Sequence, residues 1–352
     1  MSHRFLIFGP SWLGDAVMAI PTYRALREAV EDGWISVLAR GPVADLYQMV
    51  PWIDEVVVYR RPQGFSRLTA YIGLLRRLQQ VRADTAIILP RSFGSAWTAL
   101  LSDVPRRIGY RASGRDFLLT DPVERKLELL RTHRVHYLQH LLTPLGIVPG
   151  PKAPELVVHE EARIGAENLL EPLLRASPSR LVALNPGANY GSAKQWPEEG
   201  FIELARRLLE ESGLSIVLVG GPGDHPVCER IYHSVESPRL LDLSGRTSIP
   251  ELAAVLERCS FAVSNDTGAM HVAAAVNTPI IAIFGPTDPV TTRPYGKNHT
   301  LLRDPVDCSP CLLRNCPIDH RCMTGVTVDA VARACESLSG RSEPDEILRQ
   351  LS

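Results

Sequence analysis

Long apolar runs are missing from the 352-residue chain, because glycine, proline or a charged residue interrupts each run well before the length that spans a bilayer. The first ten residues hold a short apolar run but no cleavage site, so we expect no secretory signal. With 45% hydrophobic residues and a mean hydropathy of -0.01, the composition predicts a cytoplasmic globular protein whose seven cysteines are mostly reduced. The length favours two domains over one.

Two nucleotide-binding motifs are also absent. The pattern Gly-x-x-x-x-Gly-Lys-Ser/Thr does not occur, and the first turn, from Gly9 to Asp15, has the wrong spacing for Gly-x-Gly-x-x-Gly. These absences argue against P-loop and nicotinamide-binding proteins. The same turn places Asp15 at the start of a helix, where a carboxylate either caps the helix or acts as a general base. The residues alone leave both roles open.

Lysine is scarce, with four lysines against 34 arginines, and charge is unevenly distributed. Residues 1–150 contain 19 Lys+Arg and 13 Asp+Glu, whereas the remainder contains 19 and 26, so an anionic partner would prefer the first half. A spread of basic residues over several loops favours a small or amphiphilic phosphorylated ligand over nucleic acid, with a solvated basic face as the alternative. The arginines concerned are Arg60, Arg61, Arg91, Arg106, Arg107, Arg111 and Arg115.

Strand and helix patterns alternate along the chain, which is typical of parallel sheets covered by helices on both faces. The first series has expected strands at Arg4–Phe8, Ile35–Ala39, Val56–Tyr59 and Thr85–Leu89, and a helix at Asp15–Ala29 that Pro21 should kink. The second has strands at Leu181–Leu184, Ile216–Val219, Leu240–Leu243, Phe261–Ser264 and Ile280–Phe284, with helices at Glu198–Glu211, His225–Val235, Ile249–Cys259, Gly268–Val276 and Thr327–Leu338.

This alternation predicts two α/β domains, residues 1–160 and 180–326, with doubly wound parallel sheets facing a central cleft. Residues 161–179, which include an expected helix at Glu161–Leu174, form the linker between them. Residues 327–352 form a C-terminal helix and tail.

Four strands of the second series are followed by glycine-containing polar loops. Because the carboxyl ends of parallel strands meet at one sheet edge, these loops predict a binding rim. A compact ammonium such as Lys194 suits an anion, although a surface lysine is the alternative. The loops are Asn185–Pro197 with Gly187 and Lys194, Val219–His225 with Gly221 and Asp224, Asn265–Gly268, and Phe284–Pro289.

The stretch from Ser264 to Ala275 follows an apolar strand and begins an alanine-rich helix. The unpaired N–H groups and partial positive charge of a helix N-terminus suit a bound phosphate. Gly268 allows close backbone approach, Asp266 and Thr267 could cap the helix, and His271 lies one turn further on. An ordinary capped helix is the alternative to a ligand site.

Four of the cysteines, Cys308, Cys311, Cys316 and Cys322, lie in one proline-containing segment with His320 among them. The first pair has the spacing of half a zinc site, but the second pair is too loosely spaced to define one. A structural metal and reduced thiols are both compatible with this spacing.

Taken together, these motifs resemble the ADP-heptose:lipopolysaccharide heptosyltransferases, glycosyltransferase family 9. The resemblance rests on Gly9–Asp15, Pro186–Pro197, Asn265–His271 and Phe284–Pro289, which follow the family's order. The Pro-Ser-Trp and Pro-Gly-Ala variants are most similar to its heptosyltransferase II branch. Each motif alone is common, but the set is specific and covers most of the chain.

The resemblance implies a GT-B architecture of two Rossmann-like domains, with the acceptor on the first and the nucleotide sugar on the second. It implies an inverting transfer of L-glycero-D-manno-heptose from ADP-heptose to the first heptose of the lipopolysaccharide inner core, without a required cofactor. Asp15 would deprotonate the acceptor hydroxyl, and Lys194 would contact the donor's phosphates. The ADP portion would be held by Asp266, in a capping or ribose-binding role, with Thr267, Gly268, His271, Gly187, Gly221 and Asp224.

The implied partners are ADP-heptose and a phosphorylated lipid A–Kdo–heptose acceptor, with no nucleic acid. Peripheral contact with the cytoplasmic face of the inner membrane and a Mg²⁺ ion are left open. The motifs are also compatible with an acceptor at Kdo or a later heptose, with a non-catalytic nucleotide-sugar binding protein, and with an isomerase on the same scaffold.

Two features depart from the family's pattern. Pro226 stands where several relatives carry an acidic residue that touches the nucleotide, so Asp224 or Glu229 substitutes for it or the contact is lost. The cysteine segment occurs in only part of the family, and the resemblance assigns it no role.

Overall fold

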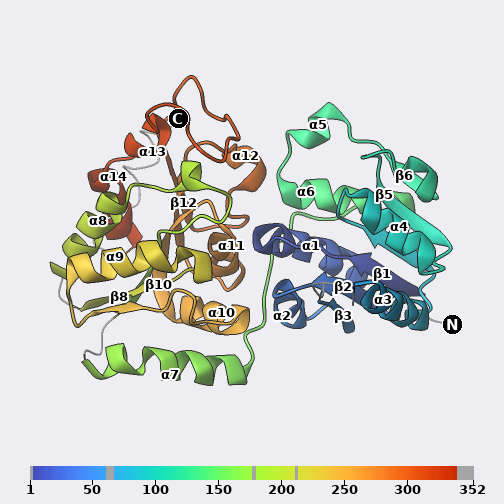
Figure 1. The fold of residues 1–352 in the computed structure, drawn as a ribbon, viewed down its shortest axis with the longest axis horizontal. Coiled ribbons are helices and arrows are strands. Elements are labelled where there is room, and N and C mark those ends of the chain that lie inside the picture. The colour runs from blue at the N-terminus through green and yellow to red at the C-terminus, as the bar shows by residue number, and fades with distance from the viewer. Residues whose placement is uncertain (1–2, 61–66, 177–179, 211–212, 339–352) are drawn as a thin grey trace. The chain divides into compact units, whose positions relative to one another are not determined.

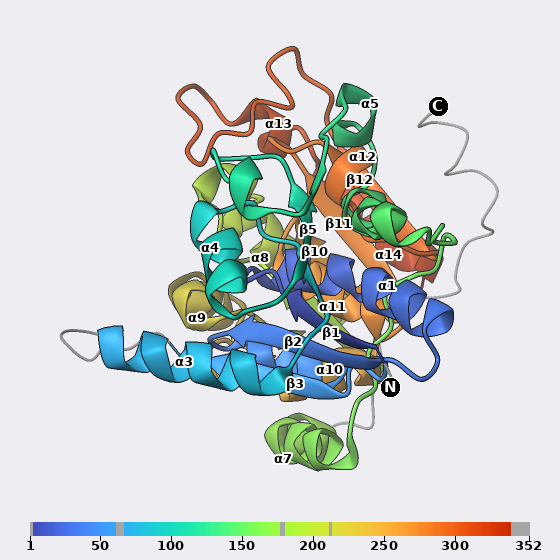
Figure 2. The ribbon, with the colours of Figure 1, turned by 90° about the vertical axis from the view of Figure 1, so that its right-hand side faces the viewer.

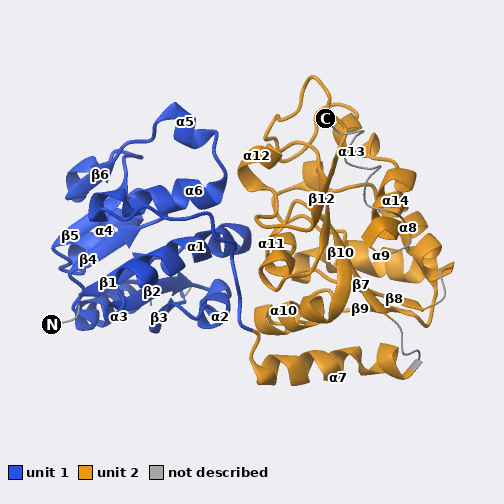
Figure 3. Cartoon of the chain, turned by 180° about the vertical axis from the view of Figure 1, so that it is seen from behind, with its two compact units in different colours: residues 1–157 blue, residues 158–352 orange. Residues whose placement is uncertain are grey.

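The computed structural model describes residues 3–60, 67–176, 180–210 and 213–338. The chain divides into two compact units, residues 1–157 and 158–352 (Figure 3). Each unit contains a parallel sheet with helices packed on it (Figure 1). The predicted α/β fold with two doubly wound parallel sheets is therefore confirmed, whereas the cleft between the domains stays a prediction.

The first unit contains a sheet of six described strands in the order β3-β2-β1-β4-β5-β6, and every pair is parallel. Its strands are β1 Arg4–Phe8, β2 Trp34–Arg40, β3 Glu55–Tyr59, β4 Thr85–Ile88, β5 Arg106–Tyr110 and β6 Asp121–Val123. Its α-helices are α1 Leu13–Ala29, α2 Val43–Gln48, α3 Arg67–Val81, α4 Phe93–Leu101, α5 Leu127–Leu130 and α6 Arg134–Gln139.

Helices cover both faces of this sheet, which explains why its central strands are apolar on both sides. One face carries α3 and α4, whose buried side chains pack with Leu6, Phe8 and Ile88. Figure 2 shows α4 and α1 on opposite sides of the strands. Helix α1 continues through Pro21.

The second unit repeats the same winding, with the strand order β12-β11-β10-β7-β8-β9. Its strands are β7 Arg180–Asn185, β8 Leu214–Leu218, β9 Leu240–Asp242, β10 Cys259–Asn265, β11 Ile280–Phe284 and β12 His299–Arg303. Its α-helices are α7 Glu160–Ala176, α8 Glu198–Glu210, α9 His225–Val235, α10 Ile249–Arg258, α11 Gly268–Ala275, α12 Pro289–Thr292, α13 Arg321–Thr324 and α14 Val328–Leu338.

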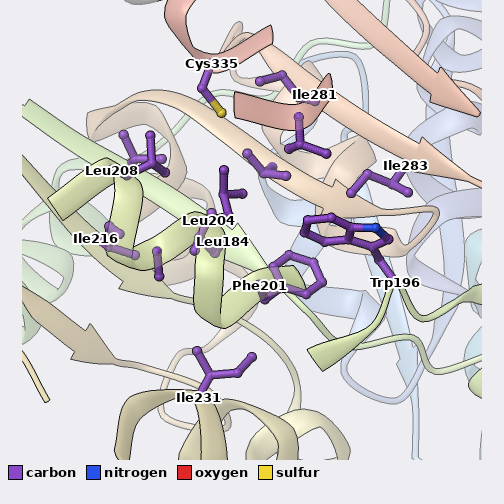
Figure 4. Packing of buried hydrophobic residues seen from close by; sticks show 14 of the residues in the cluster. Leu184, Trp196, Phe201, Leu204, Leu208, Ile216, Ile231, Ile281, Ile283 and Cys335 are labelled. Atoms are coloured by element: carbon purple, nitrogen blue, oxygen red, sulfur yellow. The ribbon is translucent and has the colours of Figure 1, made fainter. Parts of the chain in front are cut away.

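One hydrophobic cluster of the second unit lies between its sheet and helices α8, α9 and α14. Trp196 packs edge-on against Phe201 with ring centroids 5.0 Å apart, next to Ile283 of β11 (Figure 4). This packing fixes the chain just after the loop that carries Lys194.

Two sequence-based assignments differ from the structure. Residues 161–176 of the expected linker belong to α7, in line with the helix expected there, but α7 packs against α10 and belongs to the second unit. Strands β5, β6 and β12 were not predicted, because their polar and charged residues hide the apolar pattern of a buried strand.

No helix within the described residues combines the length and the apolar character that crossing a membrane requires.

Candidate active site

Each sheet has one point where the order of strands reverses, between β1 and β4 in the first unit and between β7 and β10 in the second. Loops that leave neighbouring strands in opposite directions open a crevice there, which is where open α/β sheets bind ligands. Both groups of predicted site residues lie at these two points.

In the first unit this crevice is a cavity of about 430 Å³. It is lined by the loops after β1, β2 and β4 and by α6, and its polar lining combines one carboxylate with three arginines. These charged residues are Asp15, Arg40, Arg91 and Arg134. The arrangement suits an anionic ligand that also meets a base.

Asp15 is the third residue of α1 and lines the cavity. Trp12 occupies the N-cap position, so Asp15 lies inside the helix, in its first turn. The loop before it is held by Tyr47, whose hydroxyl donates to the Pro10 carbonyl at 3.0 Å. A Cβ at Gly9 would lie 2.6 Å from that hydroxyl, so only glycine permits this approach.

Arg134 and Tyr137 of α6 complete the cavity wall. Arg134 Nε lies 3.8 Å from Asp15 Oδ1, and its guanidinium stands 5.0 Å from the Tyr137 ring. Among the described residues, Arg134 Nε and the Tyr137 hydroxyl are buried without a hydrogen-bond partner. Other described side chains, Arg115 among them, also have such atoms, but Arg134 and Tyr137 line the cavity, so we expect these two atoms to bind a ligand there. The sequence did not reveal this pair, since α6 is distant in the chain and has no motif.

The predicted set of loop arginines is partly wrong. Arg106 and Arg107 lie in β5, and Arg106 pairs with Asp121. Arg115 is fully buried and donates to the carbonyls of Tyr110 and Pro90 at 3.0 and 2.6 Å, while burial lowers its pKa to about 10. It therefore tethers the loop after β4 instead of binding a ligand. Arg61 lies outside the described residues.

In the second unit, Lys194 and Asp266 form an ion pair, with 2.5 Å between Lys194 Nζ and Asp266 Oδ2. Both side chains are largely buried, at 13% and 6% exposure. The Thr287 hydroxyl donates to the same Asp266 oxygen at 2.7 Å. Three of the four predicted strand-end loops thus meet at one carboxylate.

Hydrogen bonds from side chains to the backbone hold the loop that carries Lys194 next to Asp266. Asn265 accepts from the Trp196 backbone N–H at 3.0 Å and donates to the Pro186 carbonyl at 2.9 Å. The Trp196 indole donates to the Val326 carbonyl at 2.7 Å. The loop that carries Lys194 is consequently bound to the end of β10 on both sides of the lysine.

The predicted capping role of Asp266 and Thr267 is wrong. Thr267 is the N-cap residue of α11, but its side chain makes no capping bond and donates instead to Asn185 Oδ1 at 3.2 Å. Asp266 is committed to Lys194 and Thr287. The Thr267 side chain therefore does not bond the N–H groups that begin at Gly268, and a helix N-terminus of this kind suits an anion. His271, one turn on, is buried.

Asp224 links two loops of this edge. It accepts the Gly221 backbone N–H at 2.9 Å and a backbone N–H from Ala188, while burial raises its pKa. A Cβ at Gly187 would lie 2.0 Å from the Asp224 carboxyl carbon, so glycine is required there. Asp224 thus shapes the loops, and a direct contact with a nucleotide stays a prediction.

The four clustered cysteines are free thiols: Cys308 is exposed, Cys311 and Cys316 are half-buried, and Cys322 is buried. Burial, reinforced by the three neighbouring thiols, raises the pKa of Cys322. Within the described ranges no group of three or more His, Cys, Asp or Glu side chains is arranged to hold a metal ion.

Comparison with known proteins gives consistent results. The model of glycosyltransferase family 9 (heptosyltransferase) matches residues 72–321. Lipopolysaccharide heptosyltransferase 2 of Salmonella typhimurium is 30% identical to this chain, covering 85% of it and 88% of that protein. The heptosyltransferase 2 of Escherichia coli K12 is 29% identical with the same coverage. The structure of E. coli ADP-heptose lps heptosyltransferase II superposes with a TM-score of 0.81 at 27% identity, covering 95% of this chain and 98% of that one.

Proposed function

Because the chain belongs to glycosyltransferase family 9, the heptosyltransferase family, we propose that it transfers L-glycero-D-manno-heptose from ADP-heptose to the first heptose of the lipopolysaccharide inner core, inverting the anomeric carbon. The observation that carries the proposal is the Lys194–Asp266 pair beside an N-terminus of α11 that no Thr267 side chain caps. A cation and a helix N-terminus at one strand edge suit a diphosphate.

The donor's ADP would lie at this edge of the second unit. Negative charge grows on the diphosphate as the bond to the anomeric carbon breaks, and Lys194 with the α11 N-terminus can stabilise that charge. Asp266 keeps the ammonium in place through an ion pair, which is a different role from the capping or ribose contact that the sequence suggested.

The acceptor would lie in the cavity of the first unit, with Asp15 as the base. Its carboxylate takes the proton of the acceptor hydroxyl while the oxygen forms a bond to the anomeric carbon, and the electrons of the broken bond leave with ADP. The transition state has oxocarbenium character, and attack on the face opposite the leaving group inverts the anomeric carbon. This reaction needs the donor and the acceptor but no cofactor.

Incubation of the full-length protein with ADP-heptose and defined truncated cores tests the function. We expect the mass of one heptose to be added only to the core that ends in a single heptose, with an inverted anomeric configuration by NMR. Addition to a heptose-free Kdo core or to a later heptose would assign a different acceptor. Binding of ADP-heptose without transfer to any core would identify a binding protein instead.

We also propose that the cavity arginines bind phosphate groups of the acceptor. Removing those phosphates, or replacing Arg91 by Ala, should raise the acceptor KM about tenfold, as expected for one lost charge-assisted hydrogen bond. In Arg91→Ala the difference in KM between the phosphorylated and the dephosphorylated acceptor should be smaller than in the parent. Arg76→Ala, on the exposed surface of α3, is the matched control. An acceptor KM unaffected by dephosphorylation would refute this assignment.

An aromatic patch, Phe93, Trp97 and Phe117, adjoins this cavity through Arg91 and Ser92. The rings of Trp97 and Phe117 lie 6.3 and 6.1 Å from that of Phe93, and the three side chains are 41%, 41% and 75% exposed in chain order. Residues 91–131 hold eight Lys+Arg, of which only Arg115 is buried, and five Asp+Glu. Aromatic side chains with basic neighbours favour the interface of an anionic bilayer. We therefore propose that this patch contacts the cytoplasmic face of the membrane that carries the acceptor.

Trp97→Gln combined with Phe117→Ser should reduce binding to phosphatidylglycerol-containing vesicles about tenfold or more, because two aromatic groups no longer leave water. Turnover of an acylated acceptor in vesicles should fall with it, while turnover of a deacylated acceptor stays the same. Tyr232→Ser, an exposed aromatic residue on α9, provides the control. Equal losses on both acceptors would contradict the membrane role.

A further inference from the structure

The cysteine loop, residues 304–320 between β12 and α13, packs against the lysine loop, residues 186–195 between β7 and α8. Neither the resemblance nor the proposed chemistry uses the cysteine loop. Its contacts nevertheless converge on the residues next to Lys194.

Ala193, which directly precedes Lys194, is bonded to the cysteine loop through both of its backbone groups. Its N–H donates to the Arg314 carbonyl at 2.9 Å, and its carbonyl lies 2.8 Å from His320 Nε2. A carbonyl can only accept, so His320 carries its proton on Nε2. The peptide groups around the lysine therefore depend on a second segment of the chain.

Tyr190 links the two loops through its side chain. Its hydroxyl donates to the Leu312 carbonyl at 2.9 Å. Its ring has the Lys194 ammonium at 5.0 Å and the Arg314 guanidinium at 5.3 Å from its centroid. The ring face attracts both cations, so it restrains the direction of the lysine side chain.

The loops approach so closely that Gly191 is required. Its φ of 154° is one that other residues rarely adopt, and a Cβ there would lie 2.3 Å from the Arg314 carbonyl oxygen. A chance contact between two surface loops would not need such an approach.

The cysteine loop also holds the opposite side of the ion pair. Its Leu312 N–H donates to the Pro286 carbonyl at 2.8 Å, and its Ser309 hydroxyl donates to the Gly285 carbonyl. The two acceptor residues, Gly285 and Pro286, directly precede Thr287, whose hydroxyl donates to Asp266. One loop thus braces both the segment that carries the cation and the segment that positions its carboxylate.

We propose that the cysteine loop sets the position of the Lys194 ammonium toward the donor's diphosphate, with Tyr190 and His320 as positioning residues. The inference rests on the proposed donor role of Lys194. It deepens that role, because it makes donor turnover depend on a loop that acts through Ala193 and Tyr190.

The test compares disruptive and conservative variants at both positions. His320→Ala and Tyr190→Leu should each lower kcat/KM for ADP-heptose about tenfold, while the acceptor KM and Tm stay close to those of the parent. His320→Gln, which keeps a donor near the Nε2 position, and Tyr190→Phe, which keeps the ring, should recover most of the loss. His233→Ala, at an exposed histidine of α9, is the control outside the two loops.

Two results distinguish this inference from the proposed function. His320→Ala should have no further effect when Lys194 is already Ala, because residues that act through one group are not additive. Full activity of Lys194→Ala would overturn the donor site and this inference with it. If Lys194→Ala is impaired while His320→Ala and Tyr190→Leu are fully active, this inference alone is overturned. It is also overturned if His320→Ala and Tyr190→Leu lower kcat/KM equally for ADP-heptose and for the acceptor, and the conservative variants do not restore it.

Discussion

Asp15→Asn is expected to lower kcat by about 10²–10⁴-fold, the range that general bases contribute. The amide keeps the size of the side chain but cannot take a proton from the acceptor hydroxyl. The affinity for ADP should not change, because Lys194, Asp266 and the start of α11 belong to the second unit. Turnover measured with saturating substrates, together with ADP titration calorimetry, checks both expectations.

Asp45→Asn is the matched control for that loss. Asp45 is also an acidic residue in the first turn of a helix of the first unit, but it does not line the cavity. Both variants lose a favourable interaction with a helix dipole, worth about 0.3–1 kcal/mol. Asp15→Asn also weakens the exposed ion pair with Arg134, worth about 0–1 kcal/mol, so small decreases in Tm are expected for both variants. Only Asp15→Asn should lose turnover. A fully active Asp15→Asn would show that another group accepts the proton.

The sequence predicted the fold well where strands are buried on both faces. Strand β1 and the apolar cores of β7, β8 and β10 follow from continuous apolar runs, and alternation with helices requires parallel pairing. The strands that the sequence did not predict are those that contain polar, charged or proline residues. β5 begins with two arginines, β6 is three residues long and contains proline, and β12 lies at the sheet edge. Periodicity cannot identify such strands, because the sheet itself determines them.

The sequence predicted which loops form the site, but it did not predict which side chains contact each other within it. Parallel strands bring their carboxyl ends together, so the sequence could place Lys194 on the same sheet edge as Asp266. It could not show that Asp266 binds the lysine instead of capping α11, because that choice depends on a contact across 72 residues. Arg134 and Arg115 illustrate the same limit: one arginine without a motif lines the cavity, and another is wholly buried.

Lys194→Ala is expected to reduce kcat/KM for ADP-heptose by about 2–4 kcal/mol of transition-state stabilisation, or about 30- to 900-fold. Two effects contribute. The variant loses the cation that faces the growing charge of the diphosphate, and it leaves the buried Asp266 carboxylate with the Thr287 hydroxyl but without its ion-pair partner. An unpaired buried charge is destabilising, so Tm should fall as well.

The double variant Lys194→Ala/Asp266→Asn separates these two effects. Removing the carboxylate's charge should restore Tm toward that of the parent, because no buried charge is left unpaired, while turnover stays low for lack of the ammonium. Lys297→Ala, at an exposed lysine of the second unit, should match the parent in both measurements. Recovery of turnover in the double variant would mean that Lys194 serves only to neutralise Asp266, and an unchanged kcat/KM in Lys194→Ala would remove the lysine from the donor site.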